Sequence, residues 1–416
     1  MAAAFTSPLA EDLAEDVLAR LVRYARIDTQ SLAPRTGSPS TPGQLELARL
    51  LVEELRQIGL AEIALDANGY VMATLAGSGP TIGLIAHMDT SPDAPGAGVA
   101  PLVHRDYDGE PIVLPRGGTV LDPLAMPELA LRAGHTIVTS SGDTLLGADD
   151  KAGVAEIMAA VAYLAAHPEL PRPTVRVGFT PDEEIGLGAS LFDIERFGAI
   201  CAYTLDGSEP GELQDETFSA MAVKLVIDGV GVHPGTAKDR MVNAAVLAAR
   251  VVEALPRERL TPESTAGREG FIHVHDLTGT VDQATVTLIV RDFDDALLAS
   301  HVELVKRTAQ EIVDSQPRAQ LTVEVVHQYP NMRRFIVEHP EVVTRAEQAI
   351  REEGLEPLRT AIRGGTDGSR LSERGLPTPN IFTGGHEFHS PREWASLQEM
   401  AAAAATVVRL AAAWAD

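Results

Sequence analysis

The chain has 416 residues, of which 45% are apolar and 22% charged, so it can form two domains with hydrophobic cores and is not an intrinsically disordered chain. Its 59 acidic and 34 basic residues leave a net charge of −25, which repels phosphate and excludes nucleic acid and anionic membrane surfaces as expected partners. The single cysteine, Cys201, excludes intrachain disulfides and cysteine-rich zinc clusters, so any metal must be held by histidine and carboxylate side chains.

The chain starts with the segment MAAAFTSPLAEDLAED, which lacks the basic residues of a secretion signal. No uninterrupted apolar run reaches the roughly 18 residues that a membrane-spanning helix needs. We therefore expect a cytoplasmic protein that does not enter a membrane, and a homodimer is our hypothesis for its assembly.

Strand and helix patterns alternate in the first part of the chain. Residues 43–59 have apolar side chains at helical spacing, and TIGLIA at 81–86 is a short apolar run typical of a buried strand. A further helix and three strands are predicted to begin at Lys151, Thr174, Ile200 and near Asn380. Because such alternation produces a sheet covered by helices on both faces, we predict an α/β domain with a mostly parallel sheet.

The middle of the chain follows a different order. Strand, helix, strand, strand, helix and strand patterns succeed one another over 218–328, which is the βαββαβ order of a ferredoxin-like unit. Since the α/β pattern resumes afterwards, we predict a lid domain at 218–328, inserted into a catalytic domain that comprises 1–217 and 329–416. The segment 91–143, rich in Pro, Gly and Asp, receives no assignment.

Acidic and histidine side chains follow the predicted strands. They are His87, Asp89, Asp149, Asp150, Glu183, Glu184, Asp206 and His389. In open α/β sheets ligands bind beyond the carboxyl ends of the strands, so one crevice could receive all of these side chains. Histidines and carboxylates without a thiolate suit one or two Zn, Mn or Co ions.

A site with two metal ions needs a shared carboxylate to hold the ions close together. Asp149 opens a predicted helix, where backbone amides favour negative charge, and is our candidate for the bridging ligand. The adjacent Glu183 and Glu184 divide naturally into one metal ligand and one free base, because side chains of neighbouring residues point in different directions.

Each of these motifs has a plainer interpretation when it is taken alone. A single His-x-Asp sequence such as His87-Met88-Asp89 is a weak indication of a metal site. Two adjacent glutamates usually form a solvated turn, and Asp149-Asp150 could simply cap a helix. Their joint occurrence at strand ends favours the metal site.

Longer motifs resemble the tripeptide aminopeptidases of the di-zinc M20 metallopeptidase family. These motifs are GADDKAG (147–153), FTPDEEIG (179–186), YTLDG (203–207), VHPGTAK (232–238), IVRDFD (289–294), RGGTDG (363–368), and TPNIFTGG followed by FHS (378–390). The resemblance is colinear over nearly the whole chain. It implies an enzyme that releases the N-terminal residue from short peptides, with tripeptides preferred.

The resemblance also implies a ligand set for two divalent metal ions per chain. One ion would be bound by His87 and Asp206, and the other by Glu184 and His389. Asp149 would bridge the two ions. Zinc is the expected metal, with cobalt and manganese as alternatives.

Further roles follow from the same resemblance. Asp89 would orient His87, and Glu183 would be the general base that takes a proton from the attacking water. His233, in the inserted domain, would steady the developing oxyanion; without the resemblance it is equally a surface histidine. The peptide bond between Asp149 and Asp150 is cis in this family.

Three residues are candidates for binding the peptide's carboxylate or backbone, namely Arg291, Asn331 and Arg363. A guanidinium can bind a carboxylate through two parallel hydrogen bonds. Exposed arginines are more often simply solvated, although Arg363 is favoured by its place in the glycine-rich RGGTDG motif.

His386 lies three residues before His389 and competes with it for the ligand role. The family pattern is a histidine followed four residues later by glutamate, and only His389 satisfies it, with Glu393. We therefore predict that His386 supports the site from outside the ligand set or has a structural role.

Two other functions are kept as alternatives. The nearest is a related M20-type amidohydrolase, such as a dipeptidase, an acyl-amino-acid hydrolase or a carboxypeptidase. The second is a non-catalytic metal-binding or peptide-binding protein with the same fold, against which the intact base and ligand set argue.

Overall fold

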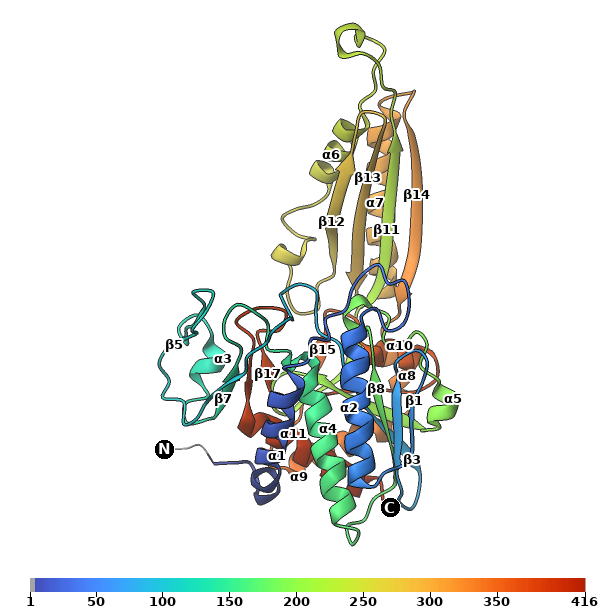
Figure 1. The fold of residues 1–416 in the computed structure, drawn as a ribbon. Coiled ribbons are helices and arrows are strands. Elements are labelled where there is room, and N and C mark those ends of the chain that lie inside the picture. Colours follow the sequence, from blue (N-terminus) through green and yellow to red (C-terminus); the bar gives the residue numbers. More distant parts are fainter. Residues whose placement is uncertain (1–3, 416) are drawn as a thin grey trace. The chain divides into compact units, whose positions relative to one another are not determined.

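The computed structural model describes residues 4–415 and divides into two compact units (Figure 1). The first unit contains the described residues up to Asp215, Arg334–Thr360 and the residues from Thr366 onward. The second unit contains Glu216–Arg333 and Ala361–Gly365. Within residues 4–415 no helix is both long enough and apolar enough to cross a membrane.

An eight-stranded sheet forms the centre of the first unit, in the order β1-β2-β8-β3-β9-β16-β10-β15. Its central strands pair in parallel and are β8 (Thr174–Thr180), β3 (Thr81–His87), β9 (Cys201–Gly207) and β16 (Asn380–Phe382). Its outer strands are β1 (Ala61–Leu65), β2 (Val71–Leu75), β10 (Glu212–Thr217) and β15 (Leu358–Ile362). The predicted α/β fold with a parallel central sheet is confirmed, and antiparallel pairs flank it.

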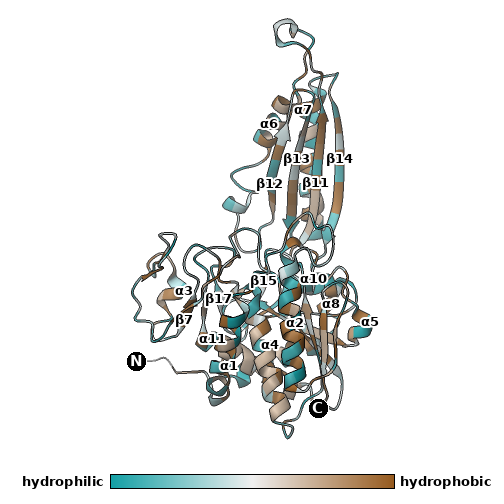
Figure 2. Ribbon diagram, in the orientation of Figure 1, coloured by the Kyte–Doolittle hydropathy of each residue, from teal (hydrophilic) through white to brown (hydrophobic). Residues whose placement is uncertain are grey.

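Helices cover both faces of this sheet, which is why its central strands are almost entirely buried. On one face α2 (Pro42–Ile58) and α4 (Ala148–Ala166) pack on the sheet, and α1 (Pro8–Tyr24) and α11 (Leu397–Ala413) pack on α4 (Figure 1). Figure 2 shows that α2 has a polar and an apolar side whereas α4 is largely apolar, because α4 lies between the sheet and the helices α1 and α11. The other face carries α5 (Ile194–Phe197) and α10 (Asp367–Glu373), and α9 (Pro340–Glu352) packs on α11.

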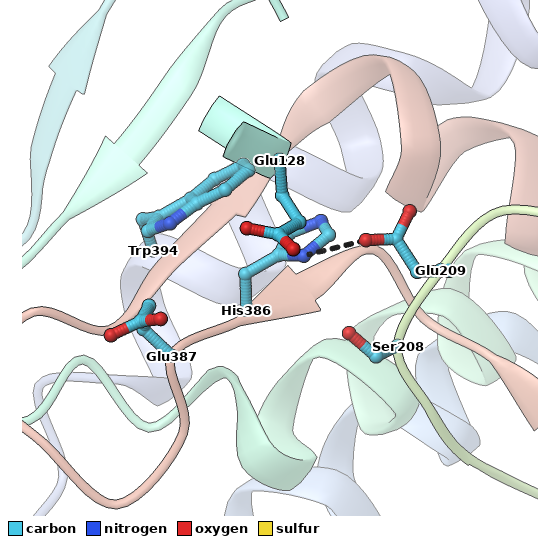
Figure 3. A pocket seen from close by; sticks show the side chains of 6 residues that line it. All are labelled: Glu128, Ser208, Glu209, His386, Glu387 and Trp394. Atoms are coloured by element: carbon cyan, nitrogen blue, oxygen red, sulfur yellow. Dashed lines mark ion pairs between the residues drawn. The ribbon is translucent and has the colours of Figure 1, made fainter. Parts of the chain in front are cut away.

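The segment that had no assignment, 91–143, forms short strands and one short helix. They are β4 (Leu102–His104), β5 (Ile112–Val113), β6 (Val120–Leu121), α3 (Pro127–Ala130) and β7 (Ile137–Thr139). Two of these strands join β17 (Gly385–His386) and β18 (Trp394–Ser396) in a sheet of order β17-β18-β7-β4. Strands of two or three residues are too short for a periodic pattern, which is why the sequence did not indicate them. This region borders the pocket shown in Figure 3.

The second unit has the predicted βαββαβ order. Its elements are β11 (Ser219–Asp228), α6 (Ala244–Ala254), β12 (Phe271–Gly279), β13 (Gln283–Asp292), α7 (Asp295–Asp314) and β14 (Gln320–Tyr329). The strands form an antiparallel sheet of order β12-β13-β11-β14, as in ferredoxin-like folds. Figure 2 shows apolar and polar residues alternating along these strands, and the buried ones pack against α6 and α7 in one core.

Candidate metal centre

The predicted ligands lie at the carboxyl ends of the parallel strands, or close by. His87 is the last residue of β3, and Asp206 lies next to the last residue of β9. Glu184 is in the short 3-10 helix η1 (Glu183–Ile185) that follows β8, Asp149 is in the first turn of α4, and His389 follows β17. This placement agrees with the rule that parallel strands present their ligands at one edge of the sheet.

The donor atoms form two groups that share one carboxylate. In the first group, His87 Nε2 lies 2.9 Å from Asp149 Oδ1 and 3.6 Å from Asp206 Oδ1. In the second, His389 Nε2 lies 3.1 Å from Asp149 Oδ2 and 3.0 Å from Glu184 Oε2. Asp149 thus presents one oxygen to each group, and the donor atoms of each group lie within 4.8 Å of one another.

The chemistry of the two groups fits divalent cations. Each group contains one imidazole nitrogen and carboxylate oxygens, a donor set that Zn, Mn and Co accept. The Oε1 atom of Glu184 is buried and has no hydrogen-bond partner among the described residues. Because a buried carboxylate oxygen without a partner is costly, a cation at this position would stabilise it.

Crowding of the carboxylates shifts the pKa of several groups. Burial raises the pKa of Glu184 to about 8, and the charge of Asp149 adds to this effect. Hydrogen bonds with Asp149 and Glu184 raise the pKa of His389 to about 11. Burial disfavours the His87 cation, but hydrogen bonds with Asp149 and Asp206 outweigh it, so the His87 pKa is raised well above its ordinary value. The cluster therefore attracts positive charge, as protons or as metal ions.

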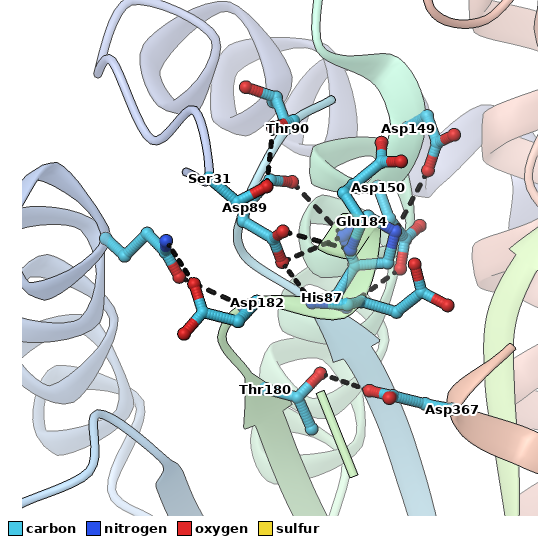
Figure 4. Close-up of polar contacts among 12 residues, drawn as sticks. Ser31, His87, Asp89, Thr90, Asp149, Asp150, Thr180, Asp182, Glu184 and Asp367 are labelled. Atoms are coloured by element: carbon cyan, nitrogen blue, oxygen red, sulfur yellow. Dashed lines mark hydrogen bonds and ion pairs between the residues drawn. The ribbon is translucent and has the colours of Figure 1, made fainter. Parts of the chain in front are cut away.

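Asp89 lies behind His87 and is fully buried. Its carboxylate accepts hydrogen bonds from the backbone N–H groups of Glu183 at 2.9 Å and Glu184 at 3.1 Å. The ring atom Nδ1 of His87 lies 3.1 Å from the backbone carbonyl of Asp89 and 3.5 Å from its carboxylate, on the side opposite Asp149 (Figure 4). In the neutral ring, a hydrogen bond from Nδ1 to that carbonyl leaves Nε2 without a proton and facing the first donor group.

Glu183 occupies the first position of η1, beside Glu184. Its pKa is raised well above the ordinary value, by burial and by the nearby Asp206 carboxylate, although His87 acts in the opposite direction. A carboxyl group with a raised pKa can hold a proton close to neutral pH, which a general base that later acts as an acid requires.

Three supporting residues were not assigned a role from the sequence. Glu393, 1% exposed, accepts hydrogen bonds from the backbone N–H groups of Leu146, Gly147 and Asp149 at 2.7, 2.8 and 3.0 Å. Asp150, whose peptide bond with Asp149 is cis, accepts from the His87 N–H at 3.0 Å.

The third of these residues is Lys151, whose buried ammonium group donates to the Ile27 carbonyl at 2.8 Å. Lys151 thereby ties the segment before α2 to the first turn of α4. Glu393 was indicated in the sequence by its position four residues after His389, and Asp150 by its place beside Asp149 before a predicted helix.

His233, Arg291, Asn331 and Arg363 lie in the second unit, not in the unit that holds the two donor groups. His233 is exposed, and its Nδ1 accepts a hydrogen bond from the Gly235 N–H at 3.1 Å. Accepting at Nδ1 leaves the ring proton on Nε2, where it can be donated.

The structure brings Arg291 and Arg363 together. Arg291 Nη1 donates to the Arg363 carbonyl at 3.2 Å, and Arg363 Nη2 donates to the Thr265 hydroxyl at 2.8 Å. Arg291 Nε and Arg363 Nη1 are buried and have no hydrogen-bond partner among the described residues. Two neighbouring guanidinium groups with spare donors suit an anion such as a carboxylate.

Asn331 is engaged differently. Its amide nitrogen lies 3.3 Å from both Glu216 Oε1 and the Phe293 carbonyl. Its side-chain oxygen accepts from the backbone N–H groups of Thr217 and Arg333. Asn331 thus holds a turn of the second unit in place and supports Glu216.

His386 belongs to neither donor group. Its ring stacks on Trp394 with 4.0 Å between the ring centres, and its Nε2 lies 2.8 Å from Glu399 Oε2. This environment is separate from the surroundings of His389, although the two residues are three positions apart.

Residues 145–413 match the model of the peptidase family M20/M25/M40. Peptidase T from Bacillus licheniformis is 48% identical to this chain over 95% of the chain and 97% of the relative. Peptidase T from Clostridium botulinum is 47% identical over 97% of the chain and its own full length.

Solved structures share the fold. Aminopeptidase PepT from Bacillus cereus matches 97% of this chain and 99% of its own length with a TM-score of 0.75 at 23% identity. A tripeptidase from Staphylococcus aureus matches 97% of this chain and 98% of its own length, also with a TM-score of 0.75, at 22% identity.

Proposed function

The chain belongs to the peptidase family M20/M25/M40, and from that premise we propose that it is a metal-dependent aminopeptidase that releases the N-terminal residue of tripeptides. The observation that carries this function is the shared Asp149, which presents one carboxylate oxygen to each of two His-containing donor groups. The relatives named Peptidase T support the substrate class.

Two divalent ions would be held by the residues of the two groups. His87 and Asp206 would bind one ion, Glu184 and His389 the other, and Asp149 both. We propose zinc, with cobalt and manganese as alternatives that the same donor types accept. Bound ions of this kind supply Lewis acidity toward the peptide carbonyl and lower the pKa of water.

The residues of the chain supply the proton transfers. Glu183 would take the proton of the attacking water and return it to the leaving nitrogen, for which its raised pKa is suited. Asp89 holds Glu183 at its backbone N–H and so positions the base. His233 would donate a hydrogen bond from its Nε2–H to the developing oxyanion and keep its proton.

The pair of arginines in the second unit would bind the C-terminal carboxylate of the peptide. Arg291 Nε and Arg363 Nη1 are buried donors without partners, and a carboxylate accepts two such bonds at once. Asn331 uses its amide on Glu216 and the Phe293 carbonyl, so we propose that it shapes this region without touching the peptide.

A hydrolysis panel combined with metal analysis tests this function. We expect about two equivalents of metal per chain, cleavage of free tripeptides at their first bond, and resistance of N-acetylated tripeptides, which have lost the charged amino group. A preference for acyl-amino acids or dipeptides, or release of the C-terminal residue, would assign the chain to another amidohydrolase of the family. Absence of any hydrolysis by metal-loaded protein would favour a binding protein.

Two further proposals concern the whole protein. Location in the cytoplasm is testable by cell fractionation. A homodimer is testable by light scattering of the purified protein, which would give twice the mass of one 44.2 kDa chain.

A further inference from the structure

A pocket of about 190 Å³ lies in the first unit, bordered by α3, the segment after β9 and the β17–β18 pair (Figure 3). It is lined by Glu128, Ser208, Glu209, His386, Glu387 and Trp394. Three of these side chains are carboxylates and none is a lysine or arginine. A cationic group therefore suits the lining, whereas a carboxylate would be repelled.

The pocket is close to the candidate metal centre. Ser208 lies two positions after Asp206, and Glu387 lies two positions before His389. Because two residues of extended chain span at most about 7 Å, the pocket wall begins within that distance of one residue from each donor group. A group bound in this pocket can thus belong to the same small peptide whose bond lies at the metal centre.

His386 is the part of the pocket wall whose hydrogen bonds can be assigned, because its ring is only 5% exposed and is held by its neighbours. Its Nε2 faces Glu399 Oε2 at 2.8 Å, and a carboxylate can only accept, so Nε2 donates. When the ring is neutral, Nδ1 is therefore an acceptor. That atom faces Glu209 Oε1 at 3.6 Å, an ion-pair contact drawn as the dashed line in Figure 3, and this distance is too long for a hydrogen bond.

His386 Nδ1 and Glu209 Oε1 therefore face each other 3.6 Å apart, and each can accept a further hydrogen bond. A group with at least two hydrogens to donate would satisfy both Nδ1 of His386 and Oε1 of Glu209. A primary ammonium group has three such hydrogens, and its charge matches the lining.

Ion pairs of the buried Arg132 keep this wall in place. Arg132 is 7% exposed and donates from Nε to Glu399 Oε1 and from Nη2 to Glu209 Oε2, both at 2.6 Å. Arg132, Glu209, His386 and Glu399 thus form a closed ring of contacts. Glu209 and His386 do not need to rearrange to receive a ligand, which lowers the entropic cost of binding.

We propose that this pocket binds a primary ammonium group of the substrate, through Glu209 and His386, with Glu128 and Glu387 adding negative charge. The proposal rests on the peptidase function argued above. The ammonium group can come from two sources, namely the amino terminus of the peptide or the side chain of an N-terminal lysine.

The test uses Glu209→Gln, which removes the charge and keeps the size, and Glu15→Gln as the matched control. Glu15 also pairs with an arginine, Arg105, but lies at an exposed position and does not line the pocket. The substrates are Ala-Gly-Gly, Lys-Gly-Gly and norleucyl-Gly-Gly, and the inhibitor is propanoyl-Gly-Gly, which lacks the amino group of Ala-Gly-Gly.

If the amino terminus binds here, Glu209→Gln raises the KM for Ala-Gly-Gly by about tenfold or more and leaves the inhibition constant of propanoyl-Gly-Gly within about twofold. If the lysine side chain binds here, the variant instead abolishes a preference of the wild type for lysyl over norleucyl substrate. Equal effects on all four compounds, or no effect on any, would overturn the proposal.

Two further measurements separate the sources of failure. A wild-type protein that cleaves no tripeptide disproves the peptidase function itself, whereas an active wild type with an insensitive pocket disproves only the ammonium site. If Glu209→Gln does not fold, the same measurements on Glu128→Gln test the ammonium site instead, because Glu128 is exposed and its substitution should not disturb the core. We expect Glu128→Gln to shift the same quantities in the same direction by about threefold.

Discussion

In the first unit the donor atoms come from segments far apart in the chain, which the parallel sheet brings to one edge. His389 Nε2 and Asp149 Oδ2, for example, are 240 positions apart and lie 3.1 Å from each other. In the second unit the sheet is antiparallel and its strands all lie within one stretch of the chain, and only Arg363 reaches its partner Arg291 from a separate segment, 72 positions later. The first region collects carboxylates, and the second collects guanidinium groups.

This difference in charge indicates a division of tasks. Crowded carboxylates attract cations and shift the pKa of neighbouring groups, which suits metal binding and proton transfer. Buried guanidinium groups with spare donors suit recognition of an anion. Substitutions at the donor groups and at Glu183 should therefore change kcat or metal content, whereas substitutions at the arginines of the second unit should change KM.

The largest effect is expected for Glu183→Gln in the first unit. Glutamine cannot take a proton at neutral pH, so kcat should fall by about 10² to 10⁴ while metal content stays near two. Glu184→Gln is the matched variant, because it weakens a ligand instead. It should lower metal content, and excess metal should partly restore its activity. Exchanged phenotypes would show that the assignments of base and ligand are reversed.

His233→Ala tests whether the second unit also contributes to the chemical step. Loss of one donor to an oxyanion costs on the order of 10² to 10³ in kcat in other hydrolases. Metal content should be unchanged, and His167→Ala, at a partly exposed site at the end of α4 in the first unit, serves as the control. A loss in kcat smaller than about threefold would make His233 an ordinary surface residue.

Arg363→Met should raise the KM for tripeptides by about 10- to 100-fold, since a hydrogen bond to a charged group contributes roughly 1.5 to 3 kcal/mol. The kcat at saturating substrate should change much less. Arg307→Met, at an exposed position of α7, is the control. A fall in kcat with unchanged KM would contradict the recognition role of the arginine pair.

The smallest effect concerns the stability of the second unit. Burial alone would raise the pKa of Glu216, but hydrogen bonds from Arg268 and Arg333 outweigh it and lower this pKa to about 2. Because the folded-state pKa is depressed, the stabilisation is present above the unfolded pKa and is lost as the pH falls toward 2. Its size should be about 1 kcal/mol, since both guanidinium groups are exposed.

Denaturant unfolding of wild type and Glu216→Gln at several pH values measures this contribution. The difference in the free energy of unfolding between the two proteins should be constant above about pH 5 and should shrink steadily below it. A difference that does not depend on pH would mean that packing, and not the charge of Glu216, stabilises this turn.

The sequence allowed the fold class and the donor set to be predicted because both depend on local patterns. Apolar runs mark the parallel strands, and the residues just after such runs must lie at one edge of the sheet. The family motifs then assigned His87, Asp149, Glu184, Asp206 and His389, which the structure brings together. Asn331 shows what this reasoning leaves out, since its residue type suggested substrate contact, while its contacts with Glu216 and the Phe293 carbonyl appear only in the tertiary structure.

The sequence by itself determined the order of the strands and helices and the residues at the strand ends, because the spacing of apolar residues that distinguishes a strand from a helix is a property of nearby residues. Only the tertiary structure decided the environment of His386. Its ring contacts Glu399 and Trp394, and Arg132, which holds Glu399, is 267 positions away from it in the chain. Part of the pocket wall is the pairing of β17 with β18, strands of two and three residues, whose pairing depends on long-range packing and leaves no periodic pattern in the sequence.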